Sequence, residues 1–168
     1  MDSVKRQKQR KVLKLIGETR VFYGLFEKEL ELFVPSMRYV KFDAGTVLLE
    51  EGAPLKGLNI VMSGSVEVFL PGVAESSSST RLNKVSLATL KRGDCFGEYN
   101  IFDDKPASAS VVGVRPGKVI CCYQDQFRTV LRENDTVAKK IYYNLLRIMV
   151  ERLRESDRDF DVLLGDTG

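Results

Sequence analysis

The chain has 168 residues, which is enough for one domain with a well-filled core and too few for two comfortable ones. Hydrophobic residues make up 43% and charged residues 29%, as in an ordinary globular protein, and a net charge of +3 is too small to indicate a nucleic-acid binder. No apolar run approaches the roughly 18 residues that a membrane span needs, and the charged N-terminus is unlike a secretion signal. We therefore expect a cytoplasmic protein with no membrane attachment.

The sequence contains no histidine and three cysteines, Cys95, Cys121 and Cys122. The missing imidazole removes the most common general base and metal ligand, and an odd number of thiols with an adjacent pair is a poor disulfide framework. We expect the cysteines to act as small buried apolar residues on strands. No nucleophile–base or paired-carboxylate arrangement stands out, so we expect no enzyme, no metal site and no cofactor.

Residues 1–20 are rich in Lys and Arg and carry apolar side chains at Val4 and from Val12 to Ile16. This pattern predicts a basic helix whose second half has a buried side. Its charged face is either simply solvated or a contact surface for an anionic partner.

Between Tyr39 and Tyr123 the sequence predicts short strands separated by turns rather than long helices. The clearest strand candidates are residues 66–70, 84–90 and 118–123. Ser63-Gly64 is a turn signal before the first of them, and the polar segment 71–81 is expected to join two strands of one hairpin. Many short strands at this spacing are typical of a jelly-roll barrel or sandwich.

After Tyr123 the pattern becomes helical. Asp125 is expected to cap a helix that ends near Glu133, and Asn134 or Asp135 to cap a long helix that ends near Asp159. The long helix carries two apolar stripes: Ile141, Leu145 and Ile148 form one, while Tyr142, Leu146, Met149, Leu153 and Phe160 lie near a heptad seam. One stripe is enough to pack on a barrel, so the second indicates a partner, unless the barrel and the N-terminal helix cover both.

The stretch from Gly93 to Val111, GDCFGEYNIFDDKPASASV, carries the most specific motif. It resembles the phosphate-binding cassette of cyclic-nucleotide-binding domains, the family of the catabolite activator protein, the regulatory subunits of cyclic-nucleotide-dependent kinases and cyclic-nucleotide-gated channels. Residues 22–30 resemble the helical segment before the barrel of this family, and 41–52 and 58–68 resemble its first two hairpins. The resemblance covers about residues 21–155.

The resemblance implies a mainly β protein with flanking helices: a jelly-roll (double-stranded β-helix) fold followed by a long C-terminal helix. It divides the chain into a basic N-terminal helix at 1–20, a cyclic-nucleotide-binding-like domain at 21–160 whose C-terminal helices begin at about 124, and a tail at 161–168. It also implies that the second stripe, with Tyr142, Leu146, Met149 and Leu153, meets the same helix of a second copy in a two-fold dimer. Because the chain ends soon after this helix, we expect no DNA-binding domain and an unidentified protein partner.

For the ligand pocket, the resemblance implies Phe96, Gly97, Glu98, Tyr99, Asn100, Ile101, Ala107 and Ser108. Glu98 would accept a hydrogen bond from the ribose hydroxyl of a cyclic nucleotide. The backbone amides from Gly97 to Ile101 would hold its phosphate at the start of a one-turn helix, together with Ser108. The arginine that the family carries in this motif is replaced by Ala107.

The missing arginine removes a permanent charge and two parallel hydrogen-bond donors from the phosphate position. Removing one partner of a buried ion pair costs roughly 3–5 kcal/mol, which lowers affinity roughly a hundredfold to a thousandfold. Asn100 also replaces a smaller residue, and Asp103-Asp104 add negative charge close by. One hypothesis is a stand-alone regulatory or adaptor module that is weak or inactive toward cAMP and cGMP; the other is a genuine sensor of cAMP, cGMP or a related messenger that signals by moving its C-terminal helix.

Overall fold

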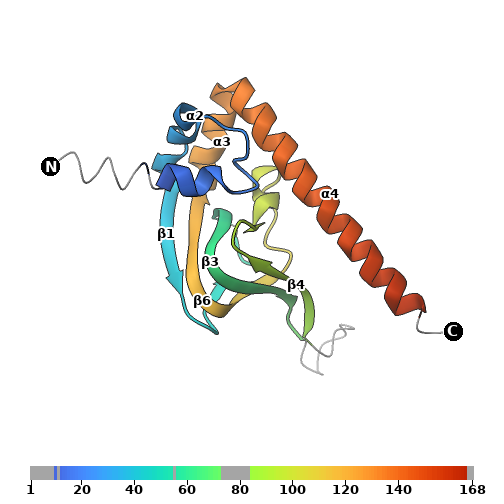
Figure 1. Cartoon of the computed structure of the whole chain (residues 1–168). Coiled ribbons are helices and arrows are strands. Elements are labelled where there is room, and N and C mark those ends of the chain that lie inside the picture. The colour runs from blue at the N-terminus through green and yellow to red at the C-terminus, as the bar shows by residue number, and fades with distance from the viewer. Residues whose placement is uncertain (1–9, 11, 55, 73–83, 166–168) are drawn as a thin grey trace.

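The computed structural model describes residues 10, 12–54, 56–72 and 84–165, with side chains up to residue 158. After a short helix at residues 12–17, its elements in chain order are α2 (Glu27–Glu31), η1 (Val34–Ser36), β1 (Met37–Phe42), β2 (Val47–Leu49), β3 (Gly57–Leu70), β4 (Val85–Lys91), β5 (Cys95–Phe96), η2 (Glu98–Ile101), β6 (Ser110–Tyr123), α3 (Gln124–Glu133) and α4 (Asp135–Gly165). The six strands form one antiparallel sheet in the order β1-β6-β3-β4, in which β2 adds to β6 and β5 adds to β3. A mainly β fold with flanking helices and a long C-terminal helix is thereby confirmed (Figure 1).

Strands β3 and β6 are each 14 residues long, in contrast to the short strands that the sequence predicts. Ser63-Gly64, which we expected to form a turn, lies inside β3, where the register between β3 and β6 shifts. Gly64 has a φ of +77°, and a Cβ there would lie 2.4 Å from the carbonyl oxygen of Arg115. The glycine therefore allows a bulge that bends β3 against β6 without ending it.

Residues 41–52 and 58–68, which resemble the first two hairpins of the family, do not form hairpins here. β1 and β2 follow each other around a turn at residues 43–46, but both pair with β6 and not with each other, and residues 58–68 all belong to β3. One predicted hairpin is confirmed, since Leu70 lies opposite Val85 in the antiparallel pair of β3 and β4. Most of the predicted polar loop 71–81 lies outside the described residues, which omit 73–83.

The two C-terminal helices begin close to where the sequence places them. The N-cap residue of α3 is Tyr123, so Asp125 lies in the first turn and not at the cap, where its carboxylate still interacts favourably with the helix dipole. α4 starts at Asp135, and the Ala138 amide donates a hydrogen bond of 2.9 Å to the Asn134 carbonyl. α4 then continues to Gly165, beyond the expected end.

The predicted N-terminal helix is described only in its second half. Residues 12–17 are helical and residues 18–24 form turns, while 1–9 and 11 lie outside the described residues. Leu13 and Ile16 are buried, as the predicted buried side requires.

The main hydrophobic core lies where the N-terminal segment, α3 and α4 meet one end of the sheet. At its centre the rings of Phe22, Phe33 and Phe127 lie within 4.8–6.2 Å of one another, centroid to centroid. Cys95 and Cys122 are fully buried in the same core, and burial raises the pKa of the Cys95 thiol to about 12. These two thiols are therefore inert packing residues, in line with the expectation.

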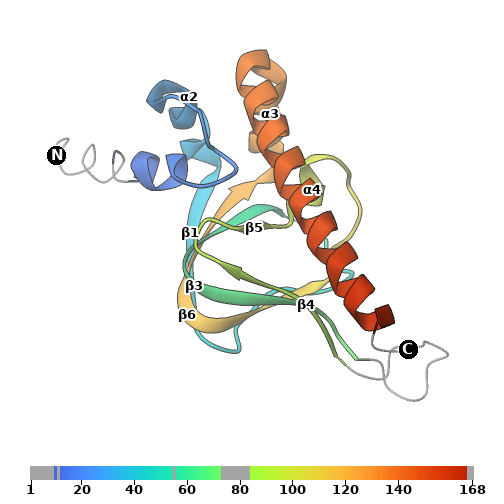
Figure 2. The same ribbon diagram turned by 45° about the vertical axis from the view of Figure 1, so that its right-hand side comes forward.

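α4 runs diagonally past the strands, and its C-terminal half extends toward the end of the sheet where β4 lies (Figure 1, Figure 2). Ile141, Leu145 and Ile148, the first predicted stripe, are 0%, 0% and 2% exposed and pack into the main core. In the second stripe, Tyr142, Leu146 and Leu153 are 44%, 59% and 62% exposed and Met149 is half-buried. The domain therefore covers only the first stripe in a single copy of the chain, and the side chain of Phe160 lies outside the described part.

Candidate functional site

Residues 93–111, called the cassette below, form β5, η2 and the loop that leads into β6. Gly97 is the N-cap of η2 and has a φ of +74°, a backbone conformation that glycine adopts without strain. In the turn that follows, three side chains are buried and one is exposed. Glu98, Asn100 and Ile101 are 4%, 2% and 7% exposed, whereas the Tyr99 ring is 49% exposed.

The Glu98 carboxylate is bound by Arg152, which reaches the cassette from α4. One guanidinium nitrogen of Arg152 donates a hydrogen bond to Glu98 Oε1, and the other donates to the carbonyl oxygen of Cys95. The Glu98 side chain is only 5% exposed, and that of Arg152 is 30% exposed. The acceptor expected to bind a ribose hydroxyl is therefore already engaged by a cation from the C-terminal helix.

Arg152 is held as a charged group in a largely buried position. Burial is the largest single influence and disfavours its charge, but the Glu98 carboxylate, together with Cys95 and Asp94, raises the Arg152 pKa above its ordinary value. The sequence prediction missed this residue. Its spacing contained a signal, because Arg152 continues the buried stripe of Ile141, Leu145 and Ile148 at helical intervals, and an arginine on a buried stripe requires an acidic partner.

Position 107, where the family motif has arginine, lies at the end of the loop that follows η2. It packs against the turn after β2. Ala107 is 5% exposed; its amide donates to the Ala53 carbonyl at 2.9 Å, and its carbonyl accepts from the Gly52 amide at 2.8 Å. These bonds fix the backbone at position 107. The methyl group supplies no charge there.

The two serines near Ala107 differ in their surroundings. Ser108, expected to touch a phosphate, is exposed, and no side-chain hydrogen bond joins it to the described residues. Ser110 is buried, and its hydroxyl oxygen accepts the Glu51 amide at 3.0 Å. Ser110 thus helps to fix the start of β6, while Ser108 is free to contact a ligand.

α3 holds the far end of η2 through a second arginine that the sequence prediction missed. Arg128 donates to the carbonyls of Asn100, Ile101 and Asp103 at 2.7, 3.3 and 3.1 Å and pairs with the Asp104 carboxylate at 2.8 Å. This contact, helped by Gln124, lowers the Asp104 pKa. The negative charge that we expected near the phosphate position is therefore partly neutralised, and η2 is fixed to α3.

Asn100 leaves one hydrogen-bond donor without a partner. Its side-chain nitrogen Nδ2 is buried and makes no hydrogen bond to any described residue. Such a donor is costly to bury, typically about 1–3 kcal/mol. Asn100 is thus larger and more polar than the small residue expected at this position, and no described residue compensates the cost of burying its amide nitrogen.

Tyr99 and Phe102 face α4 and not the interior of the cassette. Together with Tyr142, Leu146 and Met149 of α4 they line a groove of about 390 Å³. The Phe102 and Tyr142 rings lie 5.9 Å apart, centroid to centroid. The structure therefore brings one predicted pocket residue, Tyr99, together with three residues of the predicted dimer seam; Leu153 lies further along α4 and does not line the groove.

Two kinds of site are absent from the part of the chain that the structure describes. No group of Cys, Asp and Glu side chains there is arranged to hold a metal ion. No helix in the same part has both the length and the apolar character that crossing a bilayer requires.

Comparison with known proteins supports the resemblance seen in the cassette. A family model described as "Cyclic nucleotide-binding domain" matches residues 39–134. The cAMP-dependent protein kinase regulatory subunit of Emericella nidulans is 29% identical over 138 residues, which are 82% of this chain and 31% of that protein. The Cyclic AMP receptor protein of Thermus thermophilus is 27% identical over 143 residues, 85% of this chain and 61% of that protein. The chain thus spans less than two thirds of either relative.

Solved structures agree with this result. The catabolite activator protein of Thermus thermophilus has a TM-score of 0.68 and 25% identity, over 86% of this chain and 63% of that one. A cyclic nucleotide-binding domain from Methylobacillus flagellatus has a TM-score of 0.72 and 23% identity, over 90% of this chain and 82% of that one. These similarities confirm the expected jelly-roll fold.

Proposed function

The chain belongs to the cyclic-nucleotide-binding domain family, and we propose that it is a non-enzymatic regulatory module which binds cAMP and cGMP weakly and acts through a protein partner. The pairing of Glu98 with Arg152 carries this proposal. Arg152 occupies one oxygen of this carboxylate, Oε1, through a charge-assisted hydrogen bond that is about twice as strong as a neutral one. A ribose hydroxyl, a neutral donor, would therefore compete with the guanidinium for Oε1 or bind the remaining oxygen, Oε2, of a carboxylate whose charge is already compensated.

Ala107 supports the same interpretation from the phosphate side. The cassette retains the backbone amides at the start of η2 and the exposed hydroxyl of Ser108. Neither supplies the fixed positive charge that a phosphate diester attracts most strongly. The two changes act together: Ala107 weakens the attraction for the phosphate, and Arg152 raises the cost of binding the ribose.

The exposed groove between the cassette and α4 supports contact with a second copy of the chain. Tyr99, Phe102 and Leu146 are each about half exposed, at 49%, 50% and 59%. Half-exposed aromatic and aliphatic side chains around a groove are the usual composition of the centre of a protein–protein interface. A module of this kind would present a surface formed jointly by the cassette and α4.

The second candidate function is a genuine cyclic-nucleotide sensor, and Arg152 is the observation that favours it. Its guanidinium already lies against Glu98 and Cys95. If it turned from Glu98 to a bound phosphate, it would supply the charge that position 107 lacks and would free the carboxylate for the ribose. Ligand binding would then change the contact between α4 and the cassette.

Isothermal titration with cAMP and cGMP distinguishes the two functions. The weakly binding regulatory module predicts no saturable heat of binding at about 100 µM nucleotide, because its dissociation constant lies well above that concentration. A dissociation constant in the low micromolar range that is lost in Arg152→Gln would instead establish the sensor.

Restoring the missing charge tests the phosphate side directly. Ala107→Arg should raise the affinity for cAMP by at least about tenfold. Ala107→Met is the matched control, since it adds similar bulk without charge and should give no gain. Equal titrations for both variants, with folding verified by circular dichroism, would mean that the cassette does not form a phosphate pocket at all.

A further inference from the structure

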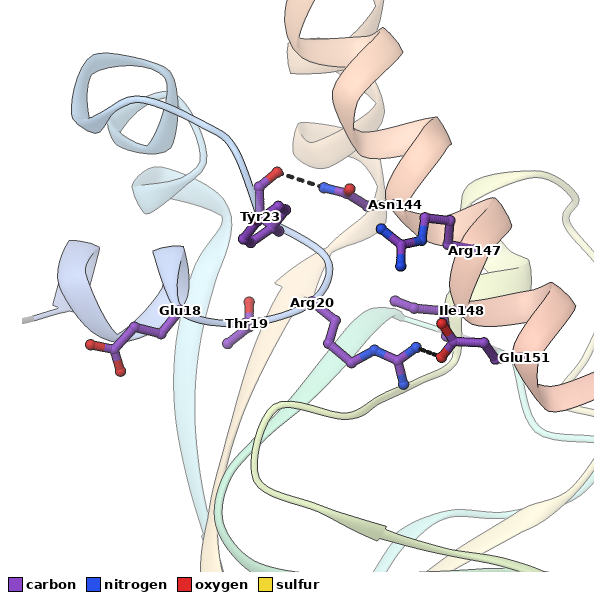
Figure 3. A pocket seen from close by; sticks show the side chains of 8 residues that line it. All are labelled: Glu18, Thr19, Arg20, Tyr23, Asn144, Arg147, Ile148 and Glu151. Carbon is purple, nitrogen blue, oxygen red and sulfur yellow. Dashed lines mark hydrogen bonds and ion pairs between the residues drawn. The ribbon is translucent and has the colours of Figure 1, made fainter. Parts of the chain in front are cut away.

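A second cleft, of about 360 Å³, lies between the turn at residues 18–23 and the middle of α4. It shares no lining residue with the cassette and is a separate site, although Arg20 of the cleft also lies 3.7 Å from the Asp94 carboxylate of the cassette. Its volume is within the range of small-molecule sites in proteins, roughly 300–1,000 Å³. Figure 3 shows Arg20 from the turn and Arg147 from α4 extending into it, whereas the Glu18 carboxylate points away from α4.

Arg147 is the one charged side chain lining this cleft that has no partner among the described residues. In Figure 3 its guanidinium extends from α4 toward the N-terminal segment, into the space between Tyr23 and Arg20. The other charged lining residues are engaged: Arg20 pairs with Glu151, and Glu18 with Arg92 at 3.2 Å. Arg147 is exposed to solvent, and its donors are therefore available to a ligand in the cleft.

The walls of the cleft supply fixed acceptors beside this cation. Asn144 is 7% exposed, and its amide nitrogen donates to the carbonyls of Val21 and Tyr23 at 3.0 and 2.8 Å. These bonds hold the side chain rigidly, and its carbonyl oxygen accepts no hydrogen bond from the described residues. Thr19 is 3% exposed and is fixed by its hydroxyl bond to Ile16. The cleft is thus polar, with preorganised walls.

We propose that this cleft binds a small molecule that combines one carboxylate or phosphate group with hydroxyl or amino groups. The anionic group binds the Arg147 guanidinium, a geometry in which two parallel hydrogen bonds form. The hydroxyl or amino groups donate to the Asn144 carbonyl oxygen and to the Glu151 carboxylate, which lies on the α4 side of the cleft. The negative charge of Glu151 disfavours a ligand that carries only anionic groups, so the ligand must carry hydrogen-bond donors as well.

Such a ligand bridges the N-terminal segment and α4. It contacts Arg147 and Asn144 on the helix and the turn at residues 18–23 that forms the opposite wall, so it stabilises the packing of the turn on the helix. Because it binds only the folded chain, it raises the midpoint of thermal unfolding as its concentration increases.

Glycerol 3-phosphate and L-serine are suitable probes for the full chain, because the first carries phosphate and hydroxyls and the second a carboxylate, an amine and a hydroxyl. At constant ionic strength we expect saturable binding of at least one probe, with a dissociation constant of about 5 mM or lower. In NMR spectra the side-chain amide of Asn144 and the backbone amide of Thr19 should shift. Comparing the two probes identifies which anionic group the cleft prefers.

Arg147→Gln should weaken binding of the preferred probe by at least about tenfold. Arg154→Gln is the matched control, because Arg154 is exposed on the same helix and outside the cleft, and it should bind as the native chain does. The proposal is overturned if neither probe saturates below about 20 mM, or if Arg147→Gln binds equally well. It is also overturned if the shifts occur at Gly97 to Ile101, which would place the probe in the cassette.

Discussion

Ala107 and Arg152 together determine the charge inside the cassette. At position 107 a methyl group stands where the family motif has a guanidinium, and at position 152 a guanidinium from α4 neutralises Glu98. The cassette is therefore contacted by a positive charge, but that charge is bound to Glu98, the residue that we predicted to accept a ribose hydroxyl. A phosphate gains the use of the Arg152 guanidinium only in competition with Glu98.

This pairing predicts a measurable coupling between Glu98 and Arg152. Arg152→Gln leaves a nearly buried carboxylate without its cation, and we expect it to lower the free energy of unfolding by about 1–3 kcal/mol, less than for a fully buried pair because Arg152 is partly exposed. In Glu98→Gln/Arg152→Gln no unpaired charge remains. The double variant should therefore lower the free energy of unfolding by less than the sum of the two single variants. Urea unfolding of the four proteins measures this cycle.

Arg154→Gln serves as the control for the cycle, since Arg154 is exposed on the same helix. It should change the free energy of unfolding by less than about 0.5 kcal/mol. Additive effects of the Glu98 and Arg152 substitutions, or an Arg152→Gln effect as small as that of the control, would contradict the pairing.

At the scale of elements, α4 uses its two stripes differently. The stripe of Ile141, Leu145 and Ile148 attaches the helix to the domain, and the stripe with Leu146 faces outward beside the cassette. An outward stripe of large apolar side chains on a helix is favourable only when a partner covers it. We propose that a second copy of α4 does so in a two-fold dimer.

Leu146→Glu with Met149→Glu should convert this dimer to monomers in sedimentation equilibrium. Both positions line the groove beside the cassette, and burying two unpaired carboxylates at a symmetric contact is strongly unfavourable. Thr136→Glu with Tyr143→Glu adds the same charges at exposed positions of α4 away from the groove, and it should leave the mass unchanged. A native chain that is monomeric at about 100 µM would refute the seam.

Local patterns predicted which elements form and one pairing, that of β3 with β4, but not the pairing of β1, β2 and β3 with β6. The alternation near Val66 and the stripes of α4 are properties of a few neighbouring residues, and both led to the observed elements. The turn signal at Ser63-Gly64 was wrong because the same glycine serves a bulge in one long strand, a choice that depends on β6 some fifty residues away. Likewise, the place of Arg152 on the buried stripe of α4 was an available signal for a buried charge that the sequence prediction did not use. Only the fold identifies Glu98 as its partner.

In the whole molecule, the N-terminal segment is joined to α4 by a contact that depends on pH. Lys140 of α4 pairs with Glu29 of α2 at 2.7 Å and lies over the Phe26 ring at 4.5 Å. The hydrogen bond from Lys140 is the largest influence and lowers the Glu29 pKa below its ordinary value of 4.5. Burial, next in size, opposes this shift, and the hydrogen bond from the Phe26 amide adds to it. The carboxylate is therefore more acidic in the folded chain than in the unfolded one.

A lowered pKa in the folded state means that the stabilisation is complete above pH 4.5, the ordinary value, and disappears as pH falls through the folded pKa. Glu29→Gln should accordingly lower the free energy of unfolding by up to about 1 kcal/mol near neutral pH, a modest amount because the pair is partly exposed. Once the pH falls below the folded pKa of Glu29, the variant and the native chain should approach equal stability, since protonation removes the same charge. Glu31→Gln, at an exposed position of α2, is the control and should differ little from the native chain throughout. Urea unfolding at several pH values measures the differences, and a Glu29→Gln effect that stays constant with pH would show that Lys140 does not stabilise the ionised carboxylate.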